Sequence, residues 1–317
     1  MLEAAWEAEL ALPCPVRTPL ERAFLEACEL GRLPEVRVLM DGHANKGEKA
    51  DRDLSKAFPE ELPWLFLTPG VGWLYGRESR ERLMDSGAFA DGSGWAAGDG
   101  VLADLRDPAG HIAVLCANLT VLVVDDHRAQ GRKRLEAWED LLDPSWEGGV
   151  AWRGNGKTFC ETTLLTLESQ FGMDRMLGFR RSVGGFGHPA QMVKALAKPG
   201  PSTPVAATLP LFFARLVPPR EGLRLVWPTE GAIASPVSLF VREGAPENIR
   251  QLERWLFSPE VADVCAGVGL PSCHPGVDWT IPEGNEVLWI GWETIRGQDL
   301  GARLKFLQKL FEGAGGS

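Results

Sequence analysis

The sequence has no long uninterrupted apolar segment, no block of basic residues and few cysteines. No run approaches the roughly 18 apolar residues of a membrane-spanning helix, so we expect no transmembrane segment. The formal net charge is −10, with Lys and Arg interspersed among acidic residues, which argues against nucleic-acid or anionic-membrane partners. Six cysteines in 317 residues, with no CxxC pair, do not form a disulfide framework.

The motifs of several enzyme classes are also missing. The chain has no G-x-S-x-G elbow, no HExxH, no GxGxxG and no paired-carboxylate motif. The histidines share no metal-type spacing, and adjacent Cys273 and His274 direct their side chains differently, so we expect no metal site. We therefore expect neither catalysis nor a cofactor.

The length and the pattern of the chain predict two α/β lobes. At 317 residues it is too long for one small core and fits two lobes of about 100–200 residues each. Short β-branched or apolar runs alternate with helical patterns, which predicts an α/β protein with mainly parallel sheets. The predicted strands include residues 36–40, 64–68, 149–152, 205–208 and 223–226.

No Ser-, Gly- or Pro-rich linker separates the lobes, so we expect the chain to cross between them on ordinary strands. The best crossings are residues 112–124 and residues 223–226. Lobe one would then be built from both ends of the chain. We expect residues 1–118 in its first part, residues 119–224 in lobe two, and residues 225–317 in the return to lobe one with C-terminal helices.

Two helix starts carry capping boxes, in which Ser or Thr is followed three residues later by Glu. Thr18 with Glu21 predicts a helix that Gly31 closes. Thr158 with Glu161 predicts a helix from about Lys157 to residue 171.

The turn Arg153-Gly154-Asn155-Gly156-Lys157-Thr158 resembles the end of a phosphate-binding P-loop, but Ala151 stands where that motif needs glycine. A Gly-rich turn into a helix N-terminus still presents free N–H groups and the positive end of the helix dipole. An anion or carboxylate site and a plain helix cap are equally compatible with it. For His188, which opens another helix, a cap is favoured over a ligand contact.

Four segments in order resemble one family. Residues 138–150, WEDLLDPSWEGGV, resemble the W-x-DLLDPxWxGxI segment of bacterial extracellular solute-binding proteins, and residues 227–236, WPTEGAIASP, resemble their P-x-E/D-G segment. Residues 258–261, SPEV, and 269–272, GLPS, resemble the helix and the turn that come next in the family. The set spans about residues 10–280. These proteins have the type 2 periplasmic-binding fold and feed ABC transporters, and they include a ferric-iron-binding branch.

The resemblance implies a monomer whose two lobes close by a hinge over one small molecule or oxyanion, for delivery to an ABC transporter permease. Arg17 and Lys157 would favour an anionic ligand. Many ferric-iron members bind metal through adjacent tyrosines late in the chain, and the sole tyrosine here, Tyr75, excludes such a pair. The ligand-binding positions carried over are Cys14, Pro15, Arg17, Thr18, Thr68, Pro69, Gly70, Asn155, Gly156, Lys157, Thr158, His188, Thr208 and Glu230.

Two alternatives remain open at this point. The first is a ligand-sensing module in the cytoplasm that signals through a partner protein. The second is a transferase-type enzyme on the same fold, with Cys14 or Cys160 as the candidate catalytic residue. The N-terminal segment has no basic n-region of a signal peptide, so the sequence as given indicates a cytoplasmic location. A removed signal would make it periplasmic or extracellular.

Overall fold

The computed structural model describes residues 6–42, 56–92, 102–155, 157, 159–274, 277 and 285–314. The chain divides into two compact units. Unit 1 comprises residues 1–118, 235–280 and 291–299, and unit 2 comprises residues 119–234, 281–290 and 300–317. No helix in the described part is long and apolar enough to cross a membrane.

This division differs from the expected lobes after residue 224. The first boundary falls at residue 118, as the expectation has it, within strand β4 (Ala113–Asp125). The second lies within β9 (Ala232–Val241) and not in residues 223–226, because that segment, β8 (Leu223–Val226), pairs with the unit 2 part of β4. The C-terminal helix also groups with unit 2.

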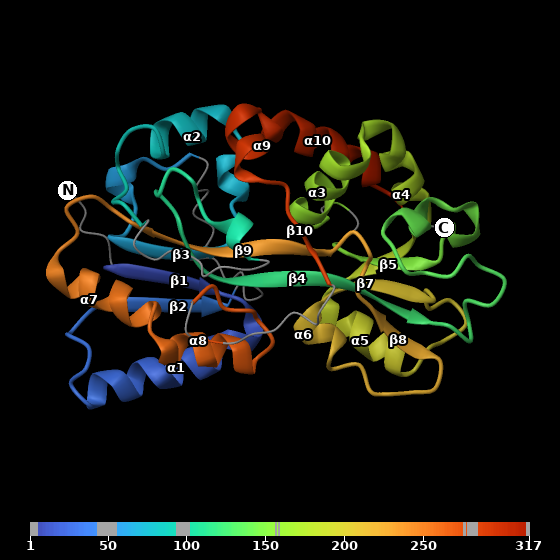
Figure 1. The fold of residues 1–317 in the computed structure, drawn as a ribbon, viewed down its shortest axis with the longest axis horizontal. Coiled ribbons are helices and arrows are strands. Elements are labelled where there is room, and N and C mark those ends of the chain that lie inside the picture. Colours follow the sequence, from blue (N-terminus) through green and yellow to red (C-terminus); the bar gives the residue numbers. More distant parts are fainter. Residues whose placement is uncertain are drawn as a thin grey trace. The chain divides into compact units, whose positions relative to one another are not determined.

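The sheet of unit 1 is built on β1 (Ala8–Leu12), whose sequence AELAL alternates buried and half-buried side chains. It pairs in parallel with β2 (Val38–Gly42) and with β3 (Leu65–Pro69), and β3 pairs antiparallel with β9. In Figure 1, one face of this sheet is covered by α1 (Cys14–Glu29), α7 (Glu247–Leu256) and α8 (Pro259–Gly267). The other face carries α2 (Arg77–Leu83) and α9 (Trp292–Gly297).

Aromatic side chains fill the core of unit 1 beneath α2. Phe66 of β3 stacks on Phe240 of β9 with ring centroids 4.7 Å apart, and Trp73 meets Phe240 edge-on at 4.9 Å. Such pairs add about 0.5–1.5 kcal/mol each beyond the burial of their area. They fix β3 against β9, and with it the end of β3 at Pro69.

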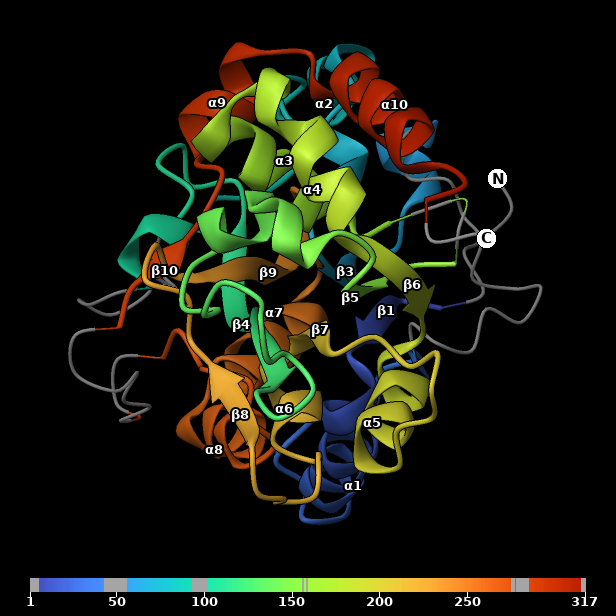
Figure 2. The ribbon, with the colours of Figure 1, turned by 90° about the vertical axis from the view of Figure 1, so that its right-hand side faces the viewer.

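The sheet of unit 2 is built around β5 (Val150–Arg153), which pairs in parallel with β6 (Val183–Gly187) and with β7 (Ala206–Pro210). β7 pairs antiparallel with β4, and β10 (Val287–Leu288) pairs in parallel with the start of β9. Figure 2 shows α3 (Glu161–Phe171), α4 (Met176–Ser182) and α10 (Leu300–Phe311) on one face. The other face carries α5 (Pro189–Ala197) and α6 (Leu211–Ala214).

The packing of α10 explains why it joins unit 2. Phe311 of α10 lies 5.7 Å from the ring of Trp152 and 5.4 Å from that of Phe159, and it is fully buried. Arg303 of α10 forms an ion pair with buried Glu168 of α3. A helix whose apolar and charged contacts all reach one core belongs to that core, whatever its place in the chain.

Both capping-box helices begin elsewhere than predicted. Helix α1 begins at Cys14, because β1 ends at Leu12 and Pro15 supplies the fixed φ that suits a first helical turn. Thr18 therefore lies inside the helix. Helix α3 begins at Glu161, because the N–H of Cys160 donates to the carbonyl of Arg153, a contact outside the helix.

The end of α1 agrees with the prediction: Gly31 comes after it with φ +67°, a conformation that suits glycine. Short 3₁₀ helices connect the larger elements. They are η1 (Pro59–Glu61), η2 (Gly72–Leu74), η4 (Ala103–Leu105), η5 (Glu139–Leu142), η6 (Pro144–Trp146) and η7 (Met173–Arg175).

Candidate functional site

In unit 1, the candidate residues lie where two parallel strands end. We call Cys14–Thr18 and Thr68–Gly70 the unit 1 edge. Cys14 and Pro15 open α1 directly after β1, Arg17 is half-buried in that helix, and Thr18 is exposed. Arg17 forms no ion pair with any residue that the structure describes. It is the single basic residue of this edge.

The β3 side of the unit 1 edge is closed by backbone contacts. Thr68 and Pro69 end β3, and Gly70 comes next with φ +87°. The N–H of Gly70 donates to the carbonyl of Pro236 at 2.7 Å, so this amide is already occupied. A ligand in this part of unit 1 would meet side chains and carbonyl groups.

In unit 2, three predicted segments come together. Because β5, β6 and β7 run parallel, their carboxyl ends meet at one edge, the place where open α/β sheets bind ligands. The N–H of Arg153, at the end of β5, donates to Thr208 Oγ1 of β7 at 3.2 Å. The N–H of Gly154 lies 3.4 Å from the carbonyl of Gly187, at the end of β6. We call residues 153–157, 187–188 and 208–210 the unit 2 edge.

Arg153 is a candidate that sequence reasoning missed. Its side chain is half-buried, and Nη1 donates to Cys160 Sγ at 3.9 Å. No carboxylate in the described ranges pairs with it. Its position as the last strand residue before the glycine-rich turn was the signal that could have identified it, because a side chain there lies at the strand end.

Asn155 and Lys157 lie in the loop between β5 and α3. Both are exposed, and Asn155 Oδ1 accepts a hydrogen bond from the N–H of Lys157 at 3.0 Å. Lys157 has no ion pair within the described part of the chain. Since α3 begins at Glu161, Lys157 does not stand in the first helical turn as predicted. Gly156 and Thr158 lie outside the described residues.

His188 caps α5, which confirms the cap interpretation. Its Nδ1 accepts a hydrogen bond from the N–H of Ala190 at 3.3 Å, and its ring meets Phe213 edge-on at 5.9 Å. The side chain is exposed. The cap leaves Nε2 as the ring nitrogen that can meet a ligand.

Glu230 is engaged in the fold of unit 2. Its two carboxylate oxygens accept the N–H groups of Trp138 and Glu139, each at 2.9 Å, at the start of η5. A carboxylate at this end of a helical turn satisfies amides that lack an intrahelical partner. Glu230 therefore binds the backbone of its own unit, and a ligand would compete with these amides.

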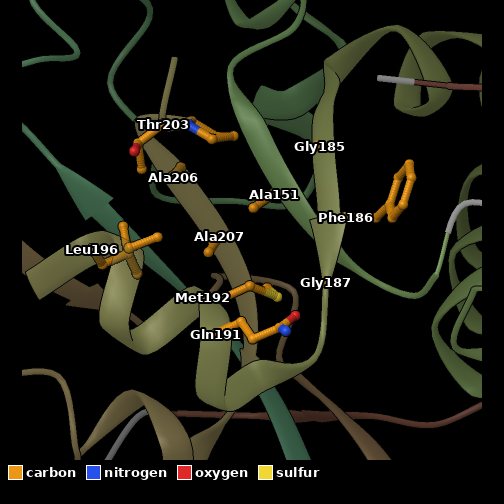
Figure 3. A pocket seen from close by; sticks show the side chains of 12 residues that line it. Ala151, Gly185, Phe186, Gly187, Gln191, Met192, Leu196, Thr203, Ala206 and Ala207 are labelled. Atoms are coloured by element: carbon orange, nitrogen blue, oxygen red, sulfur yellow. The ribbon is translucent and has the colours of Figure 1, made fainter. Parts of the chain in front are cut away.

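A separate hollow of about 150 Å³ lies between α5 and the strands of unit 2. Figure 3 shows Met192 and Leu196 reaching from α5 toward Ala151 and Ala207 on the strands. Its wall is mostly small and apolar. Of the unit 2 edge, it includes only Gly187, so the basic residues of the edge stand outside it.

The described residues hold no cluster of three or more His, Cys, Asp or Glu that fits a metal ion. Three cysteines lie together in the core of unit 1. A hydrogen bond with Cys265 and burial raise the pKa of Cys116 well above its usual value, and burial raises the pKa of Cys273 to about 12, so these two thiols are poor ligands at neutral pH. Cys116 and Cys265 are buried, whereas Cys28 and Cys160 are half-buried.

Comparisons with known proteins place this geometry in a family. Curated protein sequences give no match. Among solved structures, a Trichodesmium protein (IdiA, FutA) in complex with iron and citrate has a TM-score of 0.66 at 18% identity, over 96% of this chain and 98% of that one. The apo ferric ion-binding protein A of Pasteurella haemolytica reaches 0.69 at 13% identity, over 96% and 97%. A two-component system protein of signal transduction reaches 0.67 at 15% identity, over 95% and 98%.

These structures share the fold, which confirms the predicted two-lobed, type 2 periplasmic-binding architecture. Identities this low carry no ligand from one protein to another. The family model, however, matches residues 60–298, three quarters of the sequence. The chain therefore belongs to the bacterial extracellular solute-binding proteins.

Proposed function

We propose that this solute-binding protein captures a small anionic ligand, as a monomer, and delivers it unaltered to an ABC transporter. Family membership supports solute binding. Proteins of this kind generally do not transform their ligands, so we infer that the chain is not an enzyme. The anionic character of the ligand rests on the residues of the unit 2 edge.

The observation that carries the proposal is the unpaired Arg153. A half-buried guanidinium offers five N–H donors in a planar fork that matches a carboxylate or phosphate. Arg153 stands where three parallel strands end, and the described residues supply it with no carboxylate. Lys157 and His188 lie on the same edge, so an anion there would meet three basic side chains.

A ferric ion bound by two tyrosine phenolates is not compatible with this chain. The sequence contains one tyrosine, Tyr75, whose side chain is buried in unit 1. The structure of the Trichodesmium protein contains iron together with citrate. A metal–carboxylate complex is also an anion, so ferric citrate belongs among the ligands to be tested.

Hinge closure is the part of the proposal that derives from the family fold. Strands β4 and β9 each continue from one unit into the other. Rotation about strand residues near 118 and 234 would let the units close on a ligand with small changes in φ and ψ. Small-angle X-ray scattering should then show a smaller radius of gyration when ligand is added.

The test begins with mass spectrometry of the compound released from gently purified protein. A thermal-shift screen of carboxylates, oxyanions and ferric citrate accompanies it. A ligand present at 100 times its Kd stabilises the protein by about 2.7 kcal/mol, which is several degrees in Tm. We expect Arg153→Met and Lys157→Met to reduce that shift.

The matched control is Lys198→Met. Lys198 is an exposed lysine of unit 2 just after α5, away from the unit 2 edge, and it should keep the full shift. A neutral or cationic ligand, or a shift unchanged in Arg153→Met, would overturn the proposal. A released compound that is altered after incubation with the protein would instead favour catalysis.

A further inference from the structure

Unit 1 contains a second hollow, of about 150 Å³, whose lining includes no residue of the unit 1 edge. It lies between α2 and α9, which Figure 1 shows next to each other on one face of the unit 1 sheet. Met84, Ile112 and Ile295 contribute apolar walls, and the charged lining residues are Arg80, Asp85 and Arg296.

Arg80 is the unusual member of this set. It is 8% exposed, and among the described residues its side-chain hydrogen bonds all come from one nitrogen. That nitrogen, Nη1, donates to the carbonyls of Leu74 at 3.4 Å, Ile295 at 2.6 Å and Gln298 at 3.2 Å. Nε and Nη2 have no protein acceptor in the described ranges. An arginine this deeply buried normally has a carboxylate partner.

Arg296, which lines the same hollow, has the carboxylate partner that Arg80 lacks among the described residues. Arg296 Nη2 lies 2.5 Å from Oδ1 of Asp107, whose side chain is fully buried. The carboxylate of Asp107 also accepts the N–H groups of Ala109, His111 and Ile112. Arg296 is thus neutralised by the fold. Asp85 lines the same hollow but forms no ion pair with Arg80 in the described part of the chain.

A purely structural role accounts for only part of this arrangement. The carbonyls of Ile295 and Gln298 belong to the C-terminal end of α9, where a cation is favourable. That role uses Nη1 alone. It does not explain why Nε and Nη2 have no acceptor among the described residues. It also does not explain why a hollow, which side chains could have filled, lies beside this buried charge.

We infer that this hollow is a binding site for a short-chain monocarboxylate, separate from the solute site. A carboxylate accepts two parallel N–H bonds from one guanidinium, which fits the free Nε and Nη2 of Arg80. Met84, Ile112 and Ile295 would cover a short alkyl chain. The volume of about 150 Å³ admits a molecule of a few carbon atoms.

The test uses butyrate as the probe, with isothermal titration calorimetry on the whole chain. We expect butyrate to bind the wild type and to bind Arg80→Met at least tenfold more weakly. Arg153→Met is the control for the solute site and should bind butyrate as the wild type does. Because Arg80→Met also removes a helix contact, Ile112→Phe is the second variant: it fills the hollow, keeps Arg80 and should block butyrate.

Three results with butyrate would overturn the inference. One is a wild type that does not bind butyrate. Another is a folded Arg80→Met or Ile112→Phe variant that binds it as the wild type does. The last is binding lost in Arg153→Met and kept in Arg80→Met, which would assign butyrate to the unit 2 edge. Inorganic phosphate bound as tightly as butyrate would remove the role of the apolar wall and would count against the site as well.

Discussion

The two strand edges share a topology and differ in the connection between each strand and the next element. In unit 1, β1 passes through Pro13 straight into α1, and β3 ends in Gly70, whose N–H is already bonded. In unit 2, a loop of seven residues separates β5 from α3 and carries Asn155 and Lys157 on its exposed side.

This difference concentrates charge on one edge. The unit 1 edge contains a single cationic side chain, Arg17, whereas the unit 2 edge contains Arg153 and Lys157, and His188 adds the Nε2 of its ring. A short connection uses its polar groups to close the turn, while a long loop leaves side chains without partners in the fold. The long connection after β5 therefore adds Lys157 to an edge where Arg153 already ends a strand, although strand order makes both edges available.

The largest expected effect is on stability, from Glu230→Ala in unit 2. This change leaves two backbone N–H groups without their charged acceptor beside Trp138, whose side chain is fully buried. Each such hydrogen bond contributes about 1.5–3 kcal/mol, so we expect a loss of about 3 kcal/mol in urea denaturation. Glu230→Gln, which keeps one acceptor oxygen, should lose less. A Glu230→Ala variant that is as stable as the wild type but binds the ligand more weakly would instead indicate that Glu230 contacts the ligand.

The next largest expected effect on stability comes from the threonines at the two strand ends. Thr208 is 1% exposed and its Oγ1 accepts the N–H of Arg153, so Thr208→Val should cost about 1–2 kcal/mol. Thr68, at the matching position in unit 1, is half-buried and has no side-chain hydrogen bond among the described residues. Thr68→Val should stay within about 0.5 kcal/mol of the wild type. Equal losses in the two variants would mean that the edges do not differ in this way.

The sequence predicted the α/β class, the family and the strand-end segments. These depend on alternating apolar runs and on turn residues, which can be recognised within short segments of the sequence. It misplaced the second crossing, since the pairing of residues 223–226 with β4 joins segments about a hundred residues apart. It misplaced two helix starts: Thr18 lies inside α1, because a Thr followed by Glu also occurs within helices, and α3 begins at Glu161. Arg80 could not be recognised at all, because a missing partner is visible only once the fold surrounds the charge.

Glycines at the two edges give the next test. Gly70 has φ +87°, and a Cβ there would lie 3.7 Å from Ser235 Oγ, so space is adequate but the backbone is left-handed. Gly70→Ala should cost about 1–2 kcal/mol from backbone strain. Gly187 has no positive φ, and a Cβ would meet Gln191 and Met192 at 3.6 Å, ordinary contact distances. Gly187→Ala should change the free energy of unfolding by no more than about 0.5 kcal/mol. A loss as large as that in Gly70→Ala would show that the backbone of the unit 2 edge is as constrained as that of the unit 1 edge.

The smallest expected effect is a pH dependence that belongs to unit 2. Burial alone would raise the pKa of Asp140, but Lys133 Nζ at 2.7 Å from Oδ1 and the N–H groups of Glu136 and Ala137 at 2.8 Å from Oδ2 lower that pKa. A carboxyl whose pKa is lower in the folded chain stabilises the fold above its unfolded pKa of about 4. This stabilisation disappears as the pH falls through the lowered value.

Asp140→Asn should therefore lower the Tm at pH 7 and make the Tm fall less steeply between about pH 4 and pH 2. The matched control is Asp263→Asn on α8 of unit 1, an exposed carboxylate with no ion pair in the described residues. It should leave the acid limb of the Tm curve unchanged. If the two variants flatten the curve equally, acid sensitivity is a property of net charge, since each substitution removes one negative charge. If only Asp140→Asn does so, the charged contacts of residues 133–140 contribute to the acid sensitivity of unit 2.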